Sequence, residues 1–191
     1  MGRRQQHKPG RQCGRLTTVD PAALVTSAGR MAVQARIEDE GPPSYGLLVI
    51  EGPRHSWAAL SEAPSGPDSS FLLYLEKVPA VIVAVVRGPC RGYAASVVAR
   101  ADLVIAAGSG SGTEDFPFLY RCDEEGVVDR LQYLARALEE QPRAAISTAL
   151  LLRGSERRSE PAAFVAESAT YAMLQGSGEF TTWLQSRSEG R

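Results

Sequence analysis

The chain has 191 residues, of which 43% are hydrophobic and 23% charged, with 18 glycines and 12 prolines. This composition is typical of a folded globular domain and not of a disordered or fibrous chain. A domain of this length buries roughly 70% of the surface of its unfolded chain, so it needs no disulfide or metal to fold. The 21 basic and 22 acidic residues give a net charge of −1, which argues against a nucleic-acid partner.

The sequence contains no apolar segment long enough to cross a bilayer. The longest apolar run, Val78–Val86, is far shorter than the roughly 20 residues that a spanning helix needs, so we expect no membrane partner. Residues 1–15 are rich in arginine and contain no acidic residue. We expect them to form a disordered basic tail, with an organelle-targeting leader or an anion-binding arm as the alternatives.

The cysteines and histidines do not suggest a metal site. Cys13, Cys90 and Cys122 are an odd number, and neither they nor the two histidines have the spacing of zinc ligands. Free thiols suit a reducing compartment, so the expected location is the cytoplasm.

Helices and buried strands alternate along the sequence. Asp20 and Pro21 suit the cap and first position of a helix, and continuous apolar runs suit strands buried on both faces. The pattern predicts helices at about 20–37, 68–77, 93–100, 126–141, 142–152, 159–174 and after 179, and strands at 47–50, 81–86 and 103–107. This alternation predicts an α/β fold with a parallel sheet whose functional loops follow the strands.

Three segments are expected in the chain: the basic tail at 1–15, an α/β core at 16–155 and a helical segment at 156–191. Within the core, the stretch Gly88–Tyr93 joins a strand to a helix and contains two glycines. Such a turn can present backbone N–H groups to an anion or an oxyanion. The alternative is an ordinary tight turn, since no complete phosphate-binding motif can be written over it.

Two stretches keep the residues and spacing of a known family pattern. They are Lys77–Pro89 (KVPAVIVAVVRGP) and Ala101–Ala107 (ADLVIAA). Both resemble the central segment of the enoyl-CoA hydratase/isomerase, or crotonase, family, and Leu48–Ala59 (LVIEGPRHSWAA) is similar to an earlier part of it. The resemblance implies a crotonase-like fold, a ββα superhelix with a helical C-terminal part, N-terminally truncated relative to the family.

The resemblance also implies a binding site. It places Ala59 and Tyr93 where the family donates two backbone N–H groups to a thioester oxygen, forming an oxyanion hole that stabilises an enolate. The expected ligand is an acyl-CoA, with coenzyme A as part of the substrate and no separate cofactor. Contacts to the acyl-CoA are expected from four residues around the two turns: Arg54, His55, Trp57 and Gly92.

The two catalytic glutamates of the family fall on Ser96 and Phe118, neither of which can transfer a proton as a carboxylate does. Glu114 is the first choice for a replacement acid, and the alternative is that it is a solvated loop residue. Asp115, Tyr93, Cys90 and His55 are further candidates. The plainer roles are a small buried residue for Cys90 and a surface histidine for His55.

Three functional hypotheses follow. The first is an acyl-CoA-binding lyase or isomerase that acts through an enolate, and the family resemblance implies a homotrimer or hexamer. The second is a catalytically degenerate subunit that supports a polyketide-type synthase, as in dihydroxyphenylglycine biosynthesis, and the third is an interaction protein without a thioester site. Gly92–Ser96 (GYAAS) is also similar to the nucleophile turn of the Clp proteases, but no histidine follows His55 to serve as the base.

Overall fold

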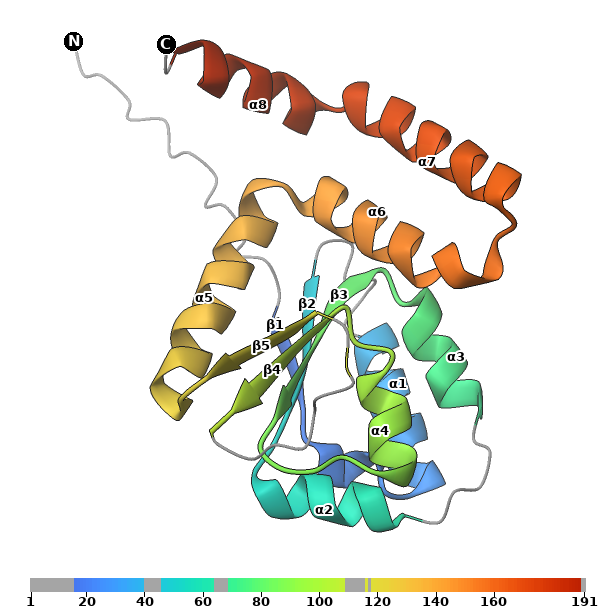
Figure 1. The fold of residues 1–191 in the computed structure, drawn as a ribbon, viewed down its shortest axis with the longest axis vertical. Coiled ribbons are helices and arrows are strands. Elements are labelled where there is room, and N and C mark those ends of the chain that lie inside the picture. The colour runs from blue at the N-terminus through green and yellow to red at the C-terminus, as the bar shows by residue number, and fades with distance from the viewer. Residues whose placement is uncertain (1–15, 40–45, 64–68, 109–115, 117, 190–191) are drawn as a thin grey trace, which may run out of the picture.

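The structure is a computed structural model that describes residues 16–39, 46–63, 69–108, 116 and 118–189 (Figure 1). Over this part of the chain, five strands form one sheet in the order β1-β2-β3-β4-β5, and every neighbouring pair is parallel. The strands are β1 (Leu16–Val19), β2 (Gly46–Glu51), β3 (Ala80–Val86), β4 (Leu103–Ala107) and β5 (Leu119–Cys122). The predicted α/β fold with a parallel sheet is thereby confirmed.

Helices connect the strands and form the C-terminal third of the chain. In chain order they are η1 (Pro21–Leu24), α1 (Ser27–Asp39), α2 (Arg54–Glu62), α3 (Ser69–Lys77), α4 (Gly92–Val98), α5 (Glu124–Glu140), α6 (Pro142–Arg153), η2 (Ser155–Arg157), α7 (Glu160–Gln175) and α8 (Gly178–Glu189). The expected segment boundary after residue 155 falls within η2, and residues 1–15 lie outside the described part.

Helices cover both faces of the central strands, and successive side chains along each strand point to alternate faces. On one face, Leu48 and Ile50 of β2 and Ile82 of β3 pack with η1 and helices α1 to α4. On the other face, Val49 of β2 and Val83 of β3 pack with α5 and α6. The apolar runs in the sequence therefore have one cause, which is that consecutive residues enter two different cores.

The first predicted helix is wrong in extent. Asp20 caps a short 3-10 helix, since its Oδ1 accepts the Ala22 N–H at 2.8 Å. A separate helix, α1, follows after Thr26, whose Oγ1 accepts the Gly29 N–H at 3.0 Å. Val19, expected near the helix start, instead ends β1, because pairing with β2 supplies its backbone partners.

Four elements were not expected from the sequence: β1, α2, β5 and the short helix η2. The two strands have four residues each, so neither has a clear period. In contrast, α7 begins close to the predicted start at residue 159, where Ser159 is the N-cap, although its side chain makes no capping hydrogen bond.

Helices α7 and α8 extend from α6 beyond the sheet and its covering helices (Figure 1). The start of α8 is tied to the start of α6 by Glu179, whose carboxylate accepts the backbone N–H groups of Arg143 at 3.2 Å and Ala144 at 3.4 Å. An acidic side chain at a helix N-terminus stabilises it. No helix in the described part of the chain is long and apolar enough to cross a membrane.

Candidate functional site

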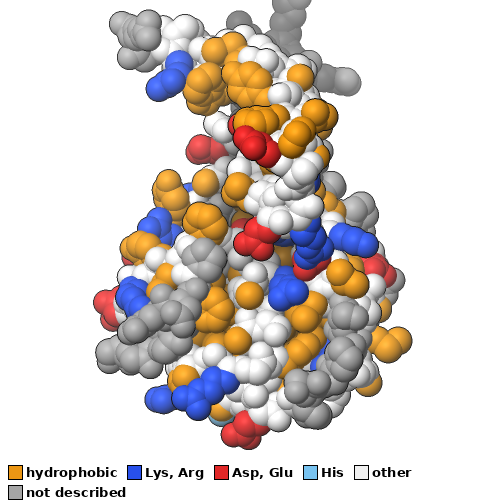
Figure 2. Space-filling model, turned by 45° about the vertical axis from the view of Figure 1, so that its right-hand side comes forward, with side chains coloured by type: hydrophobic (Ala, Val, Ile, Leu, Met, Phe, Trp, Pro, Cys, Tyr) orange, Lys and Arg blue, Asp and Glu red, His pale blue; other side chains and the backbone are white. Residues whose placement is uncertain are grey.

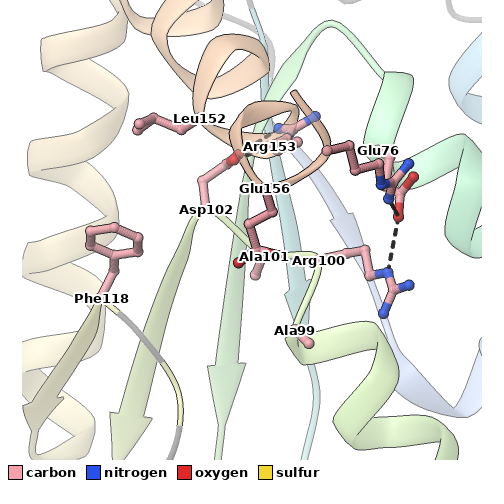
Figure 3. Close-up of a pocket in the computed structure, with 10 residues that line it drawn as sticks. Glu76, Ala99, Arg100, Ala101, Asp102, Phe118, Leu152, Arg153 and Glu156 are labelled. Carbon is pink, nitrogen blue, oxygen red and sulfur yellow. Dashed lines mark hydrogen bonds and ion pairs between the residues drawn. The ribbon is translucent and has the colours of Figure 1, made fainter. Parts of the chain in front are cut away.

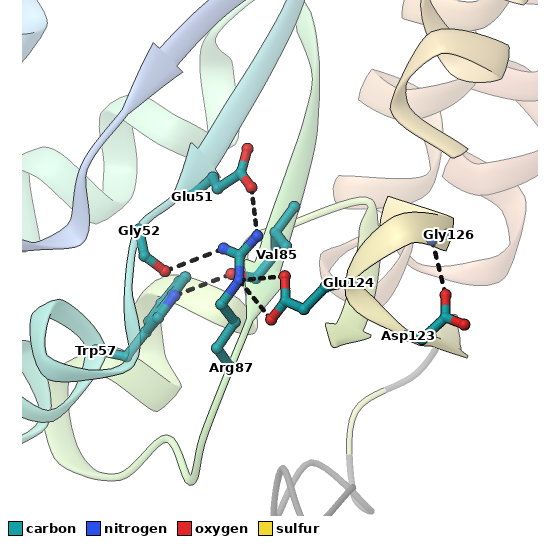
Figure 4. A network of polar contacts seen from close by, with 8 residues as sticks. All are labelled: Glu51, Gly52, Trp57, Val85, Arg87, Asp123, Glu124 and Gly126. Carbon is teal, nitrogen blue, oxygen red and sulfur yellow. Dashed lines mark hydrogen bonds and ion pairs between the residues drawn. The ribbon is translucent and has the colours of Figure 1, made fainter. Parts of the chain in front are cut away.

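The turns that follow β2 and β3 lie at the same edge of the sheet, because the strands are parallel. Arg87, the residue after β3, joins them (Figure 4): Nη2 donates to Glu51 Oε1 at 2.7 Å and Nη1 to the Gly52 carbonyl at 3.1 Å. Its Nε donates to both carboxylate oxygens of Glu124 in α5 at 2.9 Å. Burial alone would lower the pKa of Arg87, but these hydrogen bonds raise it. Arg87 was not singled out from the sequence, and it fixes the ends of β2 and β3 against α5.

The turn between β3 and α4 lies against the C-terminal half of α2. Gly92 has a φ of +52°, and a Cβ at this position would lie 3.0 Å from the Ser61 carbonyl oxygen. The Arg91 N–H donates to Ser61 Oγ at 3.2 Å. Glycine fits position 92 for two reasons, the left-handed backbone and the close approach of α2. The contact brings the start of α4 next to the segment that contains Ala59.

Ala59 and Tyr93, the expected oxyanion-hole residues, have different surroundings. Tyr93 is the second residue of α4, and its ring is 5% exposed and lies under the guanidinium group of Arg30, 4.9 Å from the ring centroid. Ala59 lies inside α2, where an α-helix uses each backbone N–H for a bond to the carbonyl four residues earlier. The two segments lie next to each other, but the Ala59 N–H belongs to a helix whose own hydrogen bonds use it.

The residues expected to contact the acyl-CoA also differ in how deeply they are buried. Trp57 is fully buried, and its Nε1 donates to the Val85 carbonyl at 2.9 Å (Figure 4). The structure therefore gives Trp57 a packing role and leaves none of its ring on the surface. Arg54 and His55 are exposed at the start of α2, and Arg54 lies over Gly88, where a Cβ would be 3.2 Å from Arg54 Cγ.

Of the positions considered for proton transfer, Cys90 and His55 lie in the segments at this edge and Phe118 does not. Glu114 and Asp115 lie outside the described residues, so their expected roles stay predictions. Ser96 Oγ donates to the Gly92 carbonyl at 3.3 Å. Phe118 directly precedes β5 and so lies at the opposite, N-terminal edge of the sheet, where it is 66% exposed. Burial raises the pKa of Cys90 to about 12, which keeps this thiol protonated and a poor nucleophile at neutral pH.

The comparisons with known proteins rest on structure. No protein-family model and no curated protein matches the sequence. Solved structures do match: a "putative enoyl-CoA hydratase" from Streptomyces coelicolor A3(2) superposes with a TM-score of 0.71 at 14% identity, over 100% of this chain and 96% of that one. The crotonase-like fold is thereby shown.

Two further structures have the same crotonase-like fold. An enoyl-CoA hydratase from Mycobacterium smegmatis has a TM-score of 0.65 at 14% identity, over 98% of this chain and 96% of that one. An enoyl-CoA hydratase from Bacillus anthracis has a TM-score of 0.64 at 10% identity, over 87% of each chain. At such identities the likeness establishes the fold and carries no activity across.

Proposed function

We propose that this chain binds an acyl-CoA thioester at the C-terminal edge of the sheet, between α2 and the turn before α4. The observation that carries the proposal is the contact of Gly92 and Arg91 with Ser61. It brings together the two segments from which the sequence resemblance expects the Ala59 and Tyr93 N–H groups. The crotonase-like fold, shared with structures named as enoyl-CoA hydratases, supports the choice of ligand.

The chemistry proposed for this site is stabilisation of an enolate. Two N–H groups that converge on the thioester oxygen would stabilise the negative charge that forms there. Because Ala59 lies within α2, its N–H can donate to a ligand only if the second half of α2 unwinds. Binding through both N–H groups therefore requires a local change in α2, while Arg54 and His55 at its start supply cationic and polar groups for the coenzyme.

A second candidate function is that of a subunit that binds a thioester or a partner without catalysing a reaction, in support of a polyketide-type synthase. The observation that favours it is the character of the two positions at which the resemblance places glutamates. Ser96 uses its hydroxyl within α4, and Phe118 stands at the opposite edge of the sheet. Neither side chain can act as a general acid or base. In other enzymes such a group accelerates the reaction by about 10²- to 10⁴-fold.

The test is the melting temperature of the full chain with CoA, acetyl-CoA and a panel of aliphatic and aromatic enoyl-CoAs. A ligand at 100 times its Kd stabilises the folded state by about 2.7 kcal/mol, which raises Tm by several degrees. A shift that depends on the acyl group supports the thioester site, and no shift with any thioester overturns it. Turnover of any enoyl-CoA in the same panel decides between the enzyme and the subunit.

Hydrogen exchange tests the change in α2. With a saturating acyl-CoA, we expect exchange to change at residues 59–62 but not in α3, which has nine residues like α2 and serves as the internal control. Unchanged exchange across α2 in the presence of bound ligand would show that Ala59 does not donate to it.

The expected homotrimer or hexamer is also a proposal. Its support is the surface of α7 and α8, where large apolar side chains gather over the upper part of the molecule (Figure 2). The most exposed are Phe164, Val165, Tyr171, Met173 and Leu184. Exposed apolar patches of this kind mark interaction surfaces. We propose that a second copy of the chain covers this patch.

A further inference from the structure

A cavity of about 390 Å³ lies at the N-terminal edge of the sheet, opposite the edge proposed for the thioester (Figure 3). Its walls come from the end of α3, the turn between α4 and β4, and the end of α6 with η2. The volume falls in the range of small-molecule sites. The proposed function does not use this cavity, although Phe118, one of the two positions at which the resemblance places a glutamate, is part of its lining.

One wall contains the ion pair of Arg153 with Asp102, in which the guanidinium group has no N–H donor left for a ligand. Arg153 Nε and Nη2 donate to the two carboxylate oxygens of Asp102, at 2.7 and 2.5 Å. Its Nη1 donates to the carbonyls of Leu75 and Val78, and its Nη2 also donates to the carbonyl of Ala80. A guanidinium group has five N–H donors, and all five are used. Arg153 therefore holds the wall in place and does not recognise a ligand.

A second wall carries two arginines that have unused donors. Arg100 Nε lies 3.4 Å from Glu76 Oε1, and Arg157 Nη2 contacts the same oxygen. Arg100 Nη1 also donates to the Ser96 carbonyl at 3.3 Å. Within the described residues, no other hydrogen bond or ion pair of these two side chains is found, although the charge of Glu156 acts on Arg157. Two cations thus converge on one carboxylate, and most of their donors remain available.

The remaining lining is largely apolar. Phe118 and Leu152, which are 66% and 53% exposed, stand across the cavity from the arginines (Figure 3). Glu156 is an exposed carboxylate that also lines the cavity, and its charge contributes to raising the pKa of Arg157. The cavity therefore has one side with two arginines, whose positive charge Glu156 partly offsets, and one side that is apolar.

We propose that this cavity is a second binding site, for a small compound that joins an anionic group to an apolar body. The planar forks of Arg100 and Arg157 match the oxygens of a carboxylate or phosphate. The apolar body packs against Phe118 and Leu152, which are otherwise exposed. Glu76 stays ionised and braces the two arginines, because its hydrogen bond with Arg157 lowers its pKa.

The test is calorimetric titration of the full chain with four probes: phenyl phosphate, benzoate, inorganic phosphate and benzyl alcohol. We expect phenyl phosphate or benzoate to bind, inorganic phosphate to bind at least tenfold more weakly, and benzyl alcohol not to bind. Equal affinity for inorganic and phenyl phosphate would overturn the apolar half of the proposal. Binding of benzyl alcohol as tight as that of benzoate would overturn the anionic half.

Variants locate the site. R157Q should keep the fold, because the Arg157 side chain is 62% exposed, and it should weaken the better probe at least tenfold, as should R100Q. E156Q should strengthen it, because the competing carboxylate is removed. The matched control is R136Q, an exposed arginine of α5. An unchanged affinity in both R157Q and R100Q overturns the proposal.

A competition experiment separates this site from the proposed thioester site. The better probe should bind with unchanged affinity in the presence of a saturating acyl-CoA, because the two sites lie at opposite edges of the sheet. Displacement by the acyl-CoA would show that the cavity belongs to the thioester site and would overturn a separate site. If the chain binds no acyl-CoA at all, the probe titrations still decide this proposal.

Discussion

Arg153 and Asp102 form a two-point ion pair between the end of α6 and the start of β4, with side chains that are 8% and 12% exposed. Asp102 Oδ2 also accepts the Ile82 N–H at 2.7 Å. The pair thus ties the C-terminal helices to the middle of the sheet. Asp102 lies in the part of the sequence that resembles the crotonase family, whereas Arg153 follows the predicted helix 142–152 and was not singled out from the sequence.

Removal of one partner should be costly. R153M leaves the Asp102 carboxylate buried without its counter-charge, and we expect a loss of about 3–5 kcal/mol in the free energy of unfolding. Urea denaturation followed by circular dichroism measures it. The control R136M, at an exposed position of α5, should change stability by less than about 0.5 kcal/mol. A loss below about 1 kcal/mol in R153M would contradict a stabilising pair.

Three glycine variants separate backbone strain from crowding. G108A places Cβ in open space at a φ of +80°, so it should lose about 1–2 kcal/mol from the backbone alone. G92A combines a φ of +52° with a Cβ 3.0 Å from the Ser61 carbonyl and should lose more. G178A, which has open space and no positive φ, should be neutral or slightly stabilising. Equal losses in G92A and G108A would mean that α2 yields to the new methyl group.

The parallel sheet could be predicted because β2, β3 and β4 are buried on both faces and appear as continuous apolar runs. The edge strands could not, since β1 and β5 have four residues each and take their backbone partners from distant strands. The same limit applies to the site. Gly92 was found from its turn, but Arg87 depends on contacts with residues 35 to 37 positions away in the chain, which no local pattern contains.

Helix α2 shows why binding residues are harder to predict than folds. The stretch from Arg54 to Ala59 resembles part of the family pattern, and that resemblance does not tell which of its residues are buried. The helix separates them instead, because its period turns Trp57 into the core and leaves Arg54 and Ala59 on the surface. Burial, which the motif does not encode, therefore distinguishes the packing residue from the candidates for ligand contact.

Trp57 and His55 provide a direct test of that distinction. W57F removes the donor to the Val85 carbonyl, so we expect a loss of about 1–3 kcal/mol in stability and an unchanged Kd for an acyl-CoA. H55A, at an exposed position, should leave stability unchanged and raise the Kd if His55 contacts the coenzyme. Denaturation and calorimetry on both variants measure the two quantities. A Kd raised by W57F but not by H55A would reverse the assignment.

Glu76 gives the stability a specific dependence on pH. Its hydrogen bond with Arg157 lowers the pKa of the folded-state carboxyl below the ordinary value of about 4.3. The stabilising contribution is therefore complete above the unfolded-state pKa and is lost as the pH falls through the folded-state value. The stability advantage of the native chain over E76Q should be full at pH 7 and shrink from about pH 5 downward. An advantage that grew on acidification would contradict the ionised state.

The surface of α7 supplies the last test, which concerns assembly. Phe164 and Val165 are 60% and 70% exposed, although their apolar side chains favour burial. If a second copy covers them, light scattering coupled to gel filtration should give a trimer or hexamer for the native chain and a smaller species for F164S with V165S. S168D, an exposed polar position of the same helix, is the control for added polarity. An assembly that persists in the double variant would move the interface away from α7, and a native monomer would remove the assembly proposal itself.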